Sequence, residues 1–234
     1  KLIKKYYNNY IDEKKKMIGL SHFLKMRGHY SSIKNLSDVD YKVFSQNGED
    51  GIIDYLLKQL DIDKPNFIEI GIGDYSESNT RFIYETRSLK GTVIDCIPNL
   101  YKKISNRIKI WKGELKILET FVDTNNINQI LKIRNPSDID LFSLDIDGND
   151  YWIVNELPEN FSKIVILEYN SVFGSEMEVT VPNIKNFERT KYHHSNLCYG
   201  MSLKAAINLM SKKNFYFIGT NQMRNNAFFI SKEY

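Results

Sequence analysis

The chain has 234 residues, of which 42% are hydrophobic and 26% are charged, and these proportions exclude a disordered or collagen-like protein. Cys96 and Cys198 are its two cysteines, too few for a disulfide-rich scaffold and too far apart for a paired zinc or redox motif. The net charge is only +3, and we expect a cytoplasmic globular protein with one main core.

The N-terminal segment, residues 1–34, contains nine Lys and Arg but only Asp12 and Glu13, a net charge of +7 that leaves −4 for the remainder. Its large apolar side chains recur at roughly helical spacing, at Leu2, Tyr6, Tyr10, Met17, Leu20, Phe23 and Leu24. We therefore expect residues 1–40 to form an extension of accessory helices whose lysines solvate the outer face. The alternative is that the lysines bind an anionic membrane surface, nucleic acid or a phosphorylated substrate.

No apolar run approaches the ~20 residues of a bilayer-spanning helix, and we expect neither a transmembrane segment nor a secretory signal.

From residue 41 onward, helix-like and strand-like segments alternate. Ser45 is placed to N-cap a helix whose apolar positions run to Leu60. The expected strands are short apolar runs at residues 66–70, 91–97, 116–122, 139–146, 163–169, 215–219 and 227–231. Further helices are expected through residue 89, over 100–110, from Thr124 or Asn125 to 131, over 151–157 and from Ser202 to 213.

This order of elements predicts the fold class. Apolar strands that alternate with helices are typical of a buried parallel sheet, and the Asn-rich connection before the last strand favours an antiparallel hairpin. We predict an α/β, Rossmann-like doubly wound domain over residues 41–234, with a mostly parallel seven-stranded sheet and an antiparallel last strand. Such sheets bind ligands at the carboxyl ends of their strands. The site should therefore collect residues 69–75, 95–98, 120–123, 145–148 and 168–171.

The first candidate site is the sequence FIEIGIGDYSESN, residues 67–79, in which an apolar strand leads through Glu69 to Gly71 and Gly73. Glycine at these positions would let a nucleotide-like ligand lie against the main chain. Asp95 ends the next strand and supplies a second carboxylate. We expect Glu69 to face the cationic methionine end of S-adenosylmethionine and Asp95 to accept hydrogen bonds from its ribose hydroxyls. A strand-end turn without a ligand is the alternative.

A nicotinamide nucleotide is the rival ligand. Gly71, Gly73 and Ser76 almost match the dinucleotide-binding fingerprint, and Asp95 stands near the distance expected for a ribose-binding acid. Ser76 in place of Gly or Ala, and Glu69 before the turn, count against this ligand. An NAD(P)-dependent sugar-nucleotide oxidoreductase is therefore kept as the alternative function.

The second candidate site lies at the ends of two further strands. Asp145 and Asp147 follow one buried strand, and Glu168 and Asn170 follow another. A carboxylate at the end of an apolar strand is costly unless it is paired or ligated, so we expect a functional role for Asp145 and Glu168. Asp145, Glu168 and Asn170 could hold Mg²⁺, which prefers oxygen ligands, or could bind substrate without a metal. Residues 147–150 would also suit a turn that merely caps the next helix.

Three further residues carry side chains that can take part in catalysis, two histidines and a cysteine. His193 and His194 lie in a polar loop, where an imidazole can act as a general base near neutral pH. Of the two we favour His194, against the alternative that both are surface residues without a role. Cys96 follows Asp95 and is expected to pack rather than to react.

Four motifs stand out in chain order: SQNGEDGI at 45–52, FIEIGIGDYSESNT at 67–80, SLDIDGNDYW at 143–152 and ILEYNS at 166–171. Together they resemble the motifs of FkbM-type methyltransferases. With NAFFI at 226–230, they look most like the bacterial branch associated with capsule and other surface-glycan gene clusters. The resemblance covers about residues 41–231 and departs from the common pattern at Tyr75, where a third glycine often stands.

The resemblance implies a class I fold, S-adenosylmethionine as donor and O-methylation as the reaction. Taken with the strand ends, it implies a donor site of Gln46, Glu69, Gly71, Gly73, Asn79, Asp95, Cys96, Phe121, Val122 and Asp145. The candidate catalytic residues are Asp145, Asp147 and His194. The expected acceptor is a sugar, a nucleotide-activated sugar or a phosphorylated precursor of a surface polysaccharide, and no nucleic-acid partner is expected. A non-catalytic subunit of the same fold, and a homodimer, both stay open.

Overall fold

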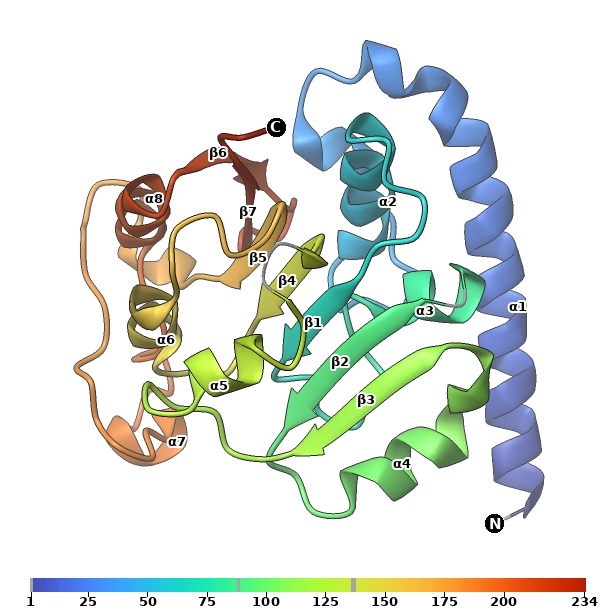
Figure 1. Ribbon diagram of the computed structural model, residues 1–234, viewed down its shortest axis with the longest axis horizontal. Helices are drawn as coiled ribbons and strands as arrows, with labels where there is room; N and C mark the ends of the chain where they lie inside the picture. The colour runs from blue at the N-terminus through green and yellow to red at the C-terminus, as the bar shows by residue number, and fades with distance from the viewer. Residues whose placement is uncertain (1, 88, 136–137) are drawn as a thin grey trace.

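The computed structural model describes residues 2–87, 89–135 and 138–234, with side chains from residue 7 onward. Seven strands in these ranges form one sheet in the order β3-β2-β1-β4-β5-β7-β6 (Figure 1). They are β1 (Phe67–Ile70), β2 (Lys90–Asp95), β3 (Glu114–Glu119), β4 (Leu141–Leu144), β5 (Ile164–Glu168), β6 (Phe215–Thr220) and β7 (Asn226–Ser231). Strands β1 to β5 are parallel, whereas β7 is antiparallel to both of its neighbours. The predicted mostly parallel α/β sheet is confirmed.

The central strands β1, β4 and β5 are buried on both faces. Because side chains alternate along a strand, successive residues enter two different cores. In β1, Phe67 belongs to the apolar core on one face and Ile68 to the core on the other. The first core contains side chains of α2 (Glu49–Gln59), α3 (Arg81–Arg87) and α4 (Leu100–Arg107). The second contains side chains of α5 (Ile127–Leu131), α6 (Asp150–Glu156) and α8 (Leu203–Lys212).

The winding direction of the sheet reverses between β1 and β4. The chain adds β2 and β3 on one side of β1, and then crosses over to place β4 and β5 on the other side. The loops that follow β1 and β4 therefore leave the same edge of the sheet in opposite directions, which opens a space for a ligand at the carboxyl ends of these strands.

Helix α2 begins three residues later than the sequence predicted, with Gly48 in place of Ser45 as the N-cap. Its first residue is Glu49 rather than a residue next to Ser45. The Ser45 hydroxyl still contacts the first turn, because it accepts a hydrogen bond from Asp50 N at 3.1 Å. The Asp50 carboxylate in turn accepts from the backbone N–H groups of Val43, Phe44 and Ser45, each at 2.7 Å. These bonds fold the residues before α2 into a compact loop.

The N-terminal segment consists of α1 (Leu2–Met26) and two short 3-10 helices, η1 (Arg27–Ser32) and η2 (Leu36–Val39). Figure 1 shows α1 at the outer edge of the molecule, running past α3 and the end of α4. Among the helices of the described residues, none is both long and apolar enough to cross a bilayer.

The face that α1 turns inward differs from the predicted one. Phe23 is buried as expected, but Tyr10, Met17, Leu20 and Leu24 are exposed. The helical spacing of these apolar residues therefore does not mark the face of α1 that packs against the domain. The side chains of Leu2 and Tyr6, which belong to the same prediction, lie outside the described ones.

Polar and small residues fill the inward face of α1 instead. Lys16 is buried and forms salt bridges with Glu13 at 2.7 Å and with Glu85 at 3.6 Å. Gly19 lets the helix approach closely, since a Cβ there would lie 2.5 Å from the side chain of Val43. Helical spacing alone could not reveal this, because it does not say which stripe of a helix meets the core.

The junction of α1 and η1 is fastened to the domain by one buried carboxylate. Asp54 of α2 accepts hydrogen bonds from Arg27 at 2.6 Å, from the Tyr30 hydroxyl at 2.9 Å and from Arg87 of α3 at 2.6 Å. Its side chain is 1% exposed, so three elements meet at this group.

Candidate functional site

A cleft of about 750 Å³ opens at the carboxyl edge of the sheet, where the loops after β1, β2, β3, β4 and β5 meet. All five segments that the sequence predicted to converge contribute to its lining. So do all ten residues of the expected donor site, namely Gln46, Glu69, Gly71, Gly73, Asn79, Asp95, Cys96, Phe121, Val122 and Asp145.

The two glycines after β1 shape the floor of the cleft. Gly71 has φ +86°, and a Cβ there would lie 1.6 Å from the carbonyl oxygen of Asp145, so no larger residue fits. Gly73 has φ +55°, and no atom lies within 4 Å of the position of a Cβ. The first glycine therefore allows close packing of the β1 and β4 loops, and the second leaves open space above the main chain.

Tyr75 occupies the position where the family pattern often has a third glycine. It adopts φ +63°, a left-handed conformation that favours glycine. Its ring is fully buried below the turn, and its hydroxyl lies 3.0 Å from Thr80 Oγ1. Because the side chain points into the core rather than into the cleft, the departure from the pattern leaves the glycine turn open.

Glu69 organises the loop that follows the turn. Its carboxylate accepts hydrogen bonds from Ser78 Oγ at 2.6 Å, from Asn79 N at 2.8 Å and from both the N–H and the hydroxyl of Thr80. Asn79 then donates to Ser143 Oγ at 3.0 Å, which links this loop to β4. Glu69 borders the cleft, but its principal partners are these loop donors.

The end of β2 holds the other side of the turn. Asp95 accepts hydrogen bonds from Gly73 N at 2.8 Å and from Ile97 N at 3.0 Å, one at each carboxylate oxygen. Each oxygen keeps a further lone pair, and the side chain is only half-buried, so Asp95 can accept bonds from a ligand.

Apolar surface adjoins Asp95. Phe121 and Val122, which follow β3, line the cleft, and Phe121 is exposed there. Cys96, which we expected to pack, directly follows the end of β2 and is exposed at the same place. Partial burial and the charge of Asp95 raise the pKa of the Cys96 thiol, which keeps it protonated near neutral pH.

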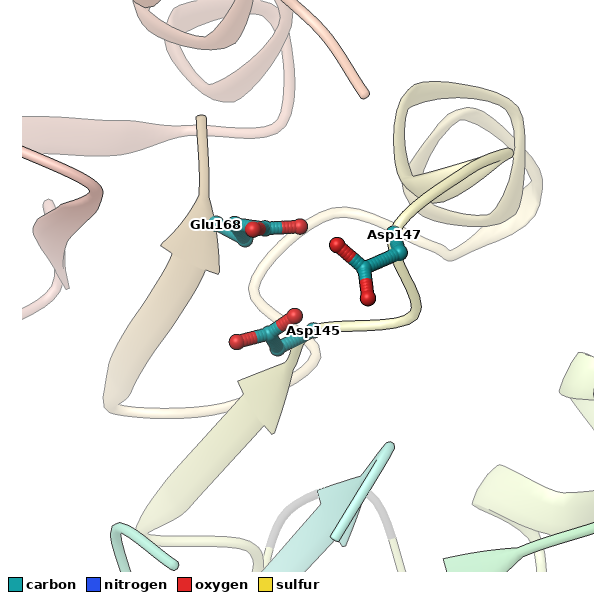
Figure 2. A group of neighbouring side chains, drawn as sticks. All are labelled: Asp145, Asp147 and Glu168. Carbon is teal, nitrogen blue, oxygen red and sulfur yellow. The ribbon is translucent and has the colours of Figure 1, made fainter. Parts of the chain in front are cut away.

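Three carboxylates lie together on the opposite side of the cleft. Asp145, Asp147 and Glu168 each offer an oxygen within 4.8 Å of the other two. Figure 2 shows Asp145 and Glu168 at the ends of β4 and β5, with Asp147 facing them from the loop after β4. The structure thus unites three of the four oxygen-bearing side chains that the sequence predicted to meet here.

The loop after β4 presents Asp147 to the cleft. Asp150 accepts hydrogen bonds from Ile146 N at 3.0 Å and Gly148 N at 2.9 Å, which closes a tight turn before α6. Asp147 stands in this turn with φ +56° and is exposed. The turn expected from residues 147–150 is therefore present, and it also places a carboxylate beside Asp145.

Glu168, which is buried, and Asp145, which is half-buried, both favour protonation. Burial raises the pKa of Asp145, and the charges of Asp150 and Asp147 raise it further. Burial also raises the pKa of Glu168, with the charge of Asp145 as the next cause. Neighbouring carboxylates of this kind titrate as a pair, and because both pKa values are raised, the pair holds at least one proton near neutral pH. Glu168 Oε2 is buried without a hydrogen-bond partner among the described residues.

A segment between β5 and α8 covers this side of the cleft. Arg189, the first residue of α7 (Arg189–Tyr192), donates a hydrogen bond to Asp147. Its guanidinium group lies over the Tyr199 ring, 4.4 Å from the ring centre. Of the lining residues in the described chain, Arg189 is the sole Lys or Arg. Arg189 and Tyr199 were not among the predicted site residues, because nothing in the sequence of a long polar loop indicates which residues turn back toward the site.

Asn226 of β7 was also missed. It lines the cleft and donates to Glu49 at 2.8 Å, while its own side-chain oxygen is buried without a partner among the described residues. The motif NAFFI contains this residue, but the sequence alone gave no reason to bring β7 next to β5.

Two predicted site residues are placed elsewhere. Asn170 is fully buried, and its amide donates to the carbonyl oxygens of Leu197 and Tyr199 at 2.7 and 3.2 Å. Its oxygen accepts from Val172 N, so the side chain holds the covering segment and is not directed at the carboxylates. His194 is exposed and, within the described residues, does not line the cleft, because residues 193–196 turn outward.

No family model and no curated protein matches this sequence. Solved structures do match. A candidate caffeoyl-CoA O-methyltransferase from Staphylococcus aureus matches over 94% of this chain and 99% of its own, with a TM-score of 0.52 and 13% identity. The SAH-bound Podospora anserina methyltransferase PaMTH1 matches over 89% of this chain and 87% of its own, with a TM-score of 0.51 and 11% identity.

The pyocyanin biosynthetic protein PhzM matches over 75% of this chain, with a TM-score of 0.43 and 13% identity. This chain spans about half of that protein, 52% of its length. At such low identities, the similarity to the two longer matches establishes that this chain shares their Rossmann-like fold. A shared fold does not determine the reaction, which depends on the residues of the site.

Proposed function

We propose that the chain is an S-adenosylmethionine-dependent O-methyltransferase, whose acceptor hydroxyl binds beside Asp145 and Glu168. The observation that carries the proposal is the shared cleft of about 750 Å³, which the glycine turn lines on one side and the carboxylate group on the other. This volume suits a nucleoside-bearing donor together with a small acceptor.

The donor half of the cleft supports this ligand over a nicotinamide nucleotide. A dinucleotide places its pyrophosphate at the N-terminus of a helix that begins directly after the glycine turn. Here α3 begins only at Arg81, and residues 74–80 form an intervening loop held by Glu69. S-adenosylmethionine has no pyrophosphate and needs no such helix. Its ribose would bond to Asp95, and its adenine would pack on Phe121 and Val122.

The acceptor half supplies groups for proton transfer. In O-methylation, the acceptor oxygen forms a bond to the methyl carbon while the carbon–sulfur bond of the donor breaks, and the hydroxyl proton must leave. We assign that proton to the ionised member of the Asp145–Glu168 pair, because burial raises its affinity for a proton. Asp147, bonded to Arg189, would position the acceptor and the covering segment.

A magnesium ion is the alternative partner of the same carboxylates. Asp145, Asp147 and Glu168 fit a small hard cation, since their oxygens lie within 4.8 Å of one another and Glu168 Oε2 lacks a hydrogen-bond partner among the described residues. Such an ion would lower the pKa of the acceptor hydroxyl. We favour the form without metal, because the carboxylate pair already provides a proton acceptor.

The acceptor class rests on the resemblance of four sequence motifs to FkbM-type methyltransferases. We propose a sugar, a nucleotide-activated sugar or a phosphorylated precursor of a surface polysaccharide. The polar lining at Gln46, Tyr199 and Asn226 suits a ligand with several hydroxyl groups.

Methyl transfer to a mixed pool of acceptors tests the function. The chain is incubated with methyl-labelled S-adenosylmethionine and with cell-envelope precursors in neutral, phosphorylated and nucleotide-linked fractions. Base-stable label in one fraction, absent with Glu168→Gln, supports the proposal and identifies the acceptor class. Stabilisation against heat by NAD(P) and not by S-adenosylmethionine would favour the oxidoreductase. Donor binding without transfer to any fraction would favour a non-catalytic subunit.

A further inference from the structure

The outer face of α1 is apolar although the helix lies at the edge of the molecule. Tyr10, Met17 and Leu24 are spaced by seven residues and therefore follow one line along the helix, about 100° around the helix from the buried Lys16 and Phe23. Other exposed apolar side chains flank this line, namely Tyr7, Ile18 and Leu20. An apolar stripe of this length on a solvent-facing helix is unusual and marks an interaction surface.

Lysines flank the stripe. Lys14 and Lys25 are exposed on α1, and the Lys14 ammonium lies 5.5 Å from the centre of the Tyr10 ring, which places it on the same face. The acids of this region are already engaged: Asp12 is bonded to Arg81, and Glu13 to Lys16. The outer face of α1 therefore combines apolar and cationic side chains.

A neighbouring element extends this surface. The short helix η3 (Ile110–Lys112) lies beside α1, because Asn9, Glu13, Lys109 and Lys112 line a common groove between them. Trp111 stands between the two lysines and is 77% exposed. An exposed tryptophan flanked by lysines suits the boundary between lipid headgroups and acyl chains, where an indole has both apolar and polar surroundings.

We propose that the outer face of α1, together with Trp111, docks the protein on an anionic lipid surface. Apolar side chains of the stripe would enter the headgroup boundary while the lysines contact anionic headgroups. The combination distinguishes this partner from two others. Nucleic acid would engage the lysines but has no use for a line of Met and Leu. A second copy of the chain would bring lysines such as Lys14 against one another.

Vesicle binding by the full chain tests the proposal. Two vesicle types are compared, phosphatidylcholine alone and phosphatidylcholine with about a third phosphatidylglycerol. We expect co-sedimentation with the anionic vesicles, weaker binding to the neutral ones, and loss of most binding at high salt. Trp111 emission should shift to shorter wavelength on binding, and Trp111→Phe should remove that shift.

Two substitutions of the same kind separate the stripe from the rest of the surface. Met17→Glu places a charge in the middle of the stripe, whereas Met223→Glu does so in the β6–β7 connection, at almost the same exposure, 66% against 65%. Met17→Glu should weaken binding at least about tenfold and Met223→Glu should not. Lys14→Gln should weaken it about fivefold. Circular dichroism of each variant confirms the fold.

Three results would overturn the proposal. The first is no binding of the wild-type chain to anionic vesicles. The second is equal binding of Met17→Glu and Met223→Glu, which would mean that charge alone drives association. The third is a dimer in solution that Met17→Glu dissociates while vesicles bind neither form, because a second copy would then cover the stripe.

Discussion

The Asp95 carboxylate accepts hydrogen bonds from the protein itself and has lone pairs left for a ligand. It already holds Gly73 N and Ile97 N. Asp95→Ala removes an ionised acceptor worth about 1.5 to 3 kcal/mol per ligand hydrogen bond, so S-adenosylmethionine should bind at least about tenfold more weakly. Calorimetric titration measures this. Asp63→Ala, at an exposed carboxylate, is the control, and normal donor affinity in a folded Asp95→Ala would contradict the placement of the ribose.

Gly71 tests whether close packing of the β1 and β4 loops requires the absence of a side chain. Gly71→Ala would place Cβ 1.6 Å from a backbone oxygen, whereas Gly174→Ala, also at positive φ, would meet no atom within 4 Å. Gly174→Ala should cost about 1 to 3 kcal/mol from backbone strain alone, because φ +68° with ψ −165° is a conformation that is almost exclusive to glycine. Gly71→Ala adds a clash with the backbone to such strain, so it should cost clearly more than Gly174→Ala or prevent folding. Urea unfolding compares the two, and equal losses would show that β4 can move away.

Substitution of Glu168 should impair catalysis without weakening donor binding. Glu168→Gln keeps the shape but cannot take up the proton, and we expect a loss of about 10²- to 10⁴-fold in kcat with little change in donor affinity. If Glu168→Gln kept full activity, the carboxylate pair would have no part in the mechanism.

Chelation with EDTA distinguishes a carboxylate site that works without metal from one that holds Mg²⁺. Without a metal, exhaustive EDTA treatment leaves the wild-type rate unchanged and only the substitutions reduce it. With a bound Mg²⁺, EDTA abolishes activity, leaves donor affinity nearly intact, and added Mg²⁺ restores the rate. We expect the first outcome, and a rate that depends on Mg²⁺ would correct it.

At the scale of elements, α1 depends on one buried carboxylate. Asp54→Ala would leave Arg27, Arg87 and the Tyr30 hydroxyl without their shared acceptor, and breaking a buried pair in this way costs about 3 to 5 kcal/mol. Urea unfolding should register the loss, and limited proteolysis should cut the segment after α1 sooner. Lys58→Ala, in an exposed pair with Asp61, should change stability by less than about 1 kcal/mol. Similar losses in both variants would contradict this anchoring role.

Elements differ in how well their sequences specify them. The strands were predictable because a buried parallel strand must be apolar on both faces, and short runs of this kind end in recognisable turns. The last helix was predictable for a similar reason, since Ser202 caps it through a bond to Ala205 N. The inward face of α1 was not, because a buried Lys16 and a close approach at Gly19 depend on partners far away in the chain.

In the molecule as a whole, the predictable part of the site consists of the residues at the carboxyl ends of the strands. Parallel strands bring their carboxyl ends to one edge, so Glu69, Asp95, Asp145 and Glu168 had to be neighbours once the fold was right. Arg189 reaches the cleft from a long loop, and no periodicity or turn signal reveals such a path. For the same reason, the outward turn of His194 could not be foreseen.

Calorimetric titration of the wild-type chain with S-adenosylmethionine measures whether the cleft binds a methyl donor. We expect saturable binding at one site per chain, weakened at least about tenfold by Asp95→Ala and unaffected by Asp63→Ala. No detectable heat of binding up to millimolar donor, from a chain whose circular dichroism shows it folded, would mean that the cleft does not bind this donor.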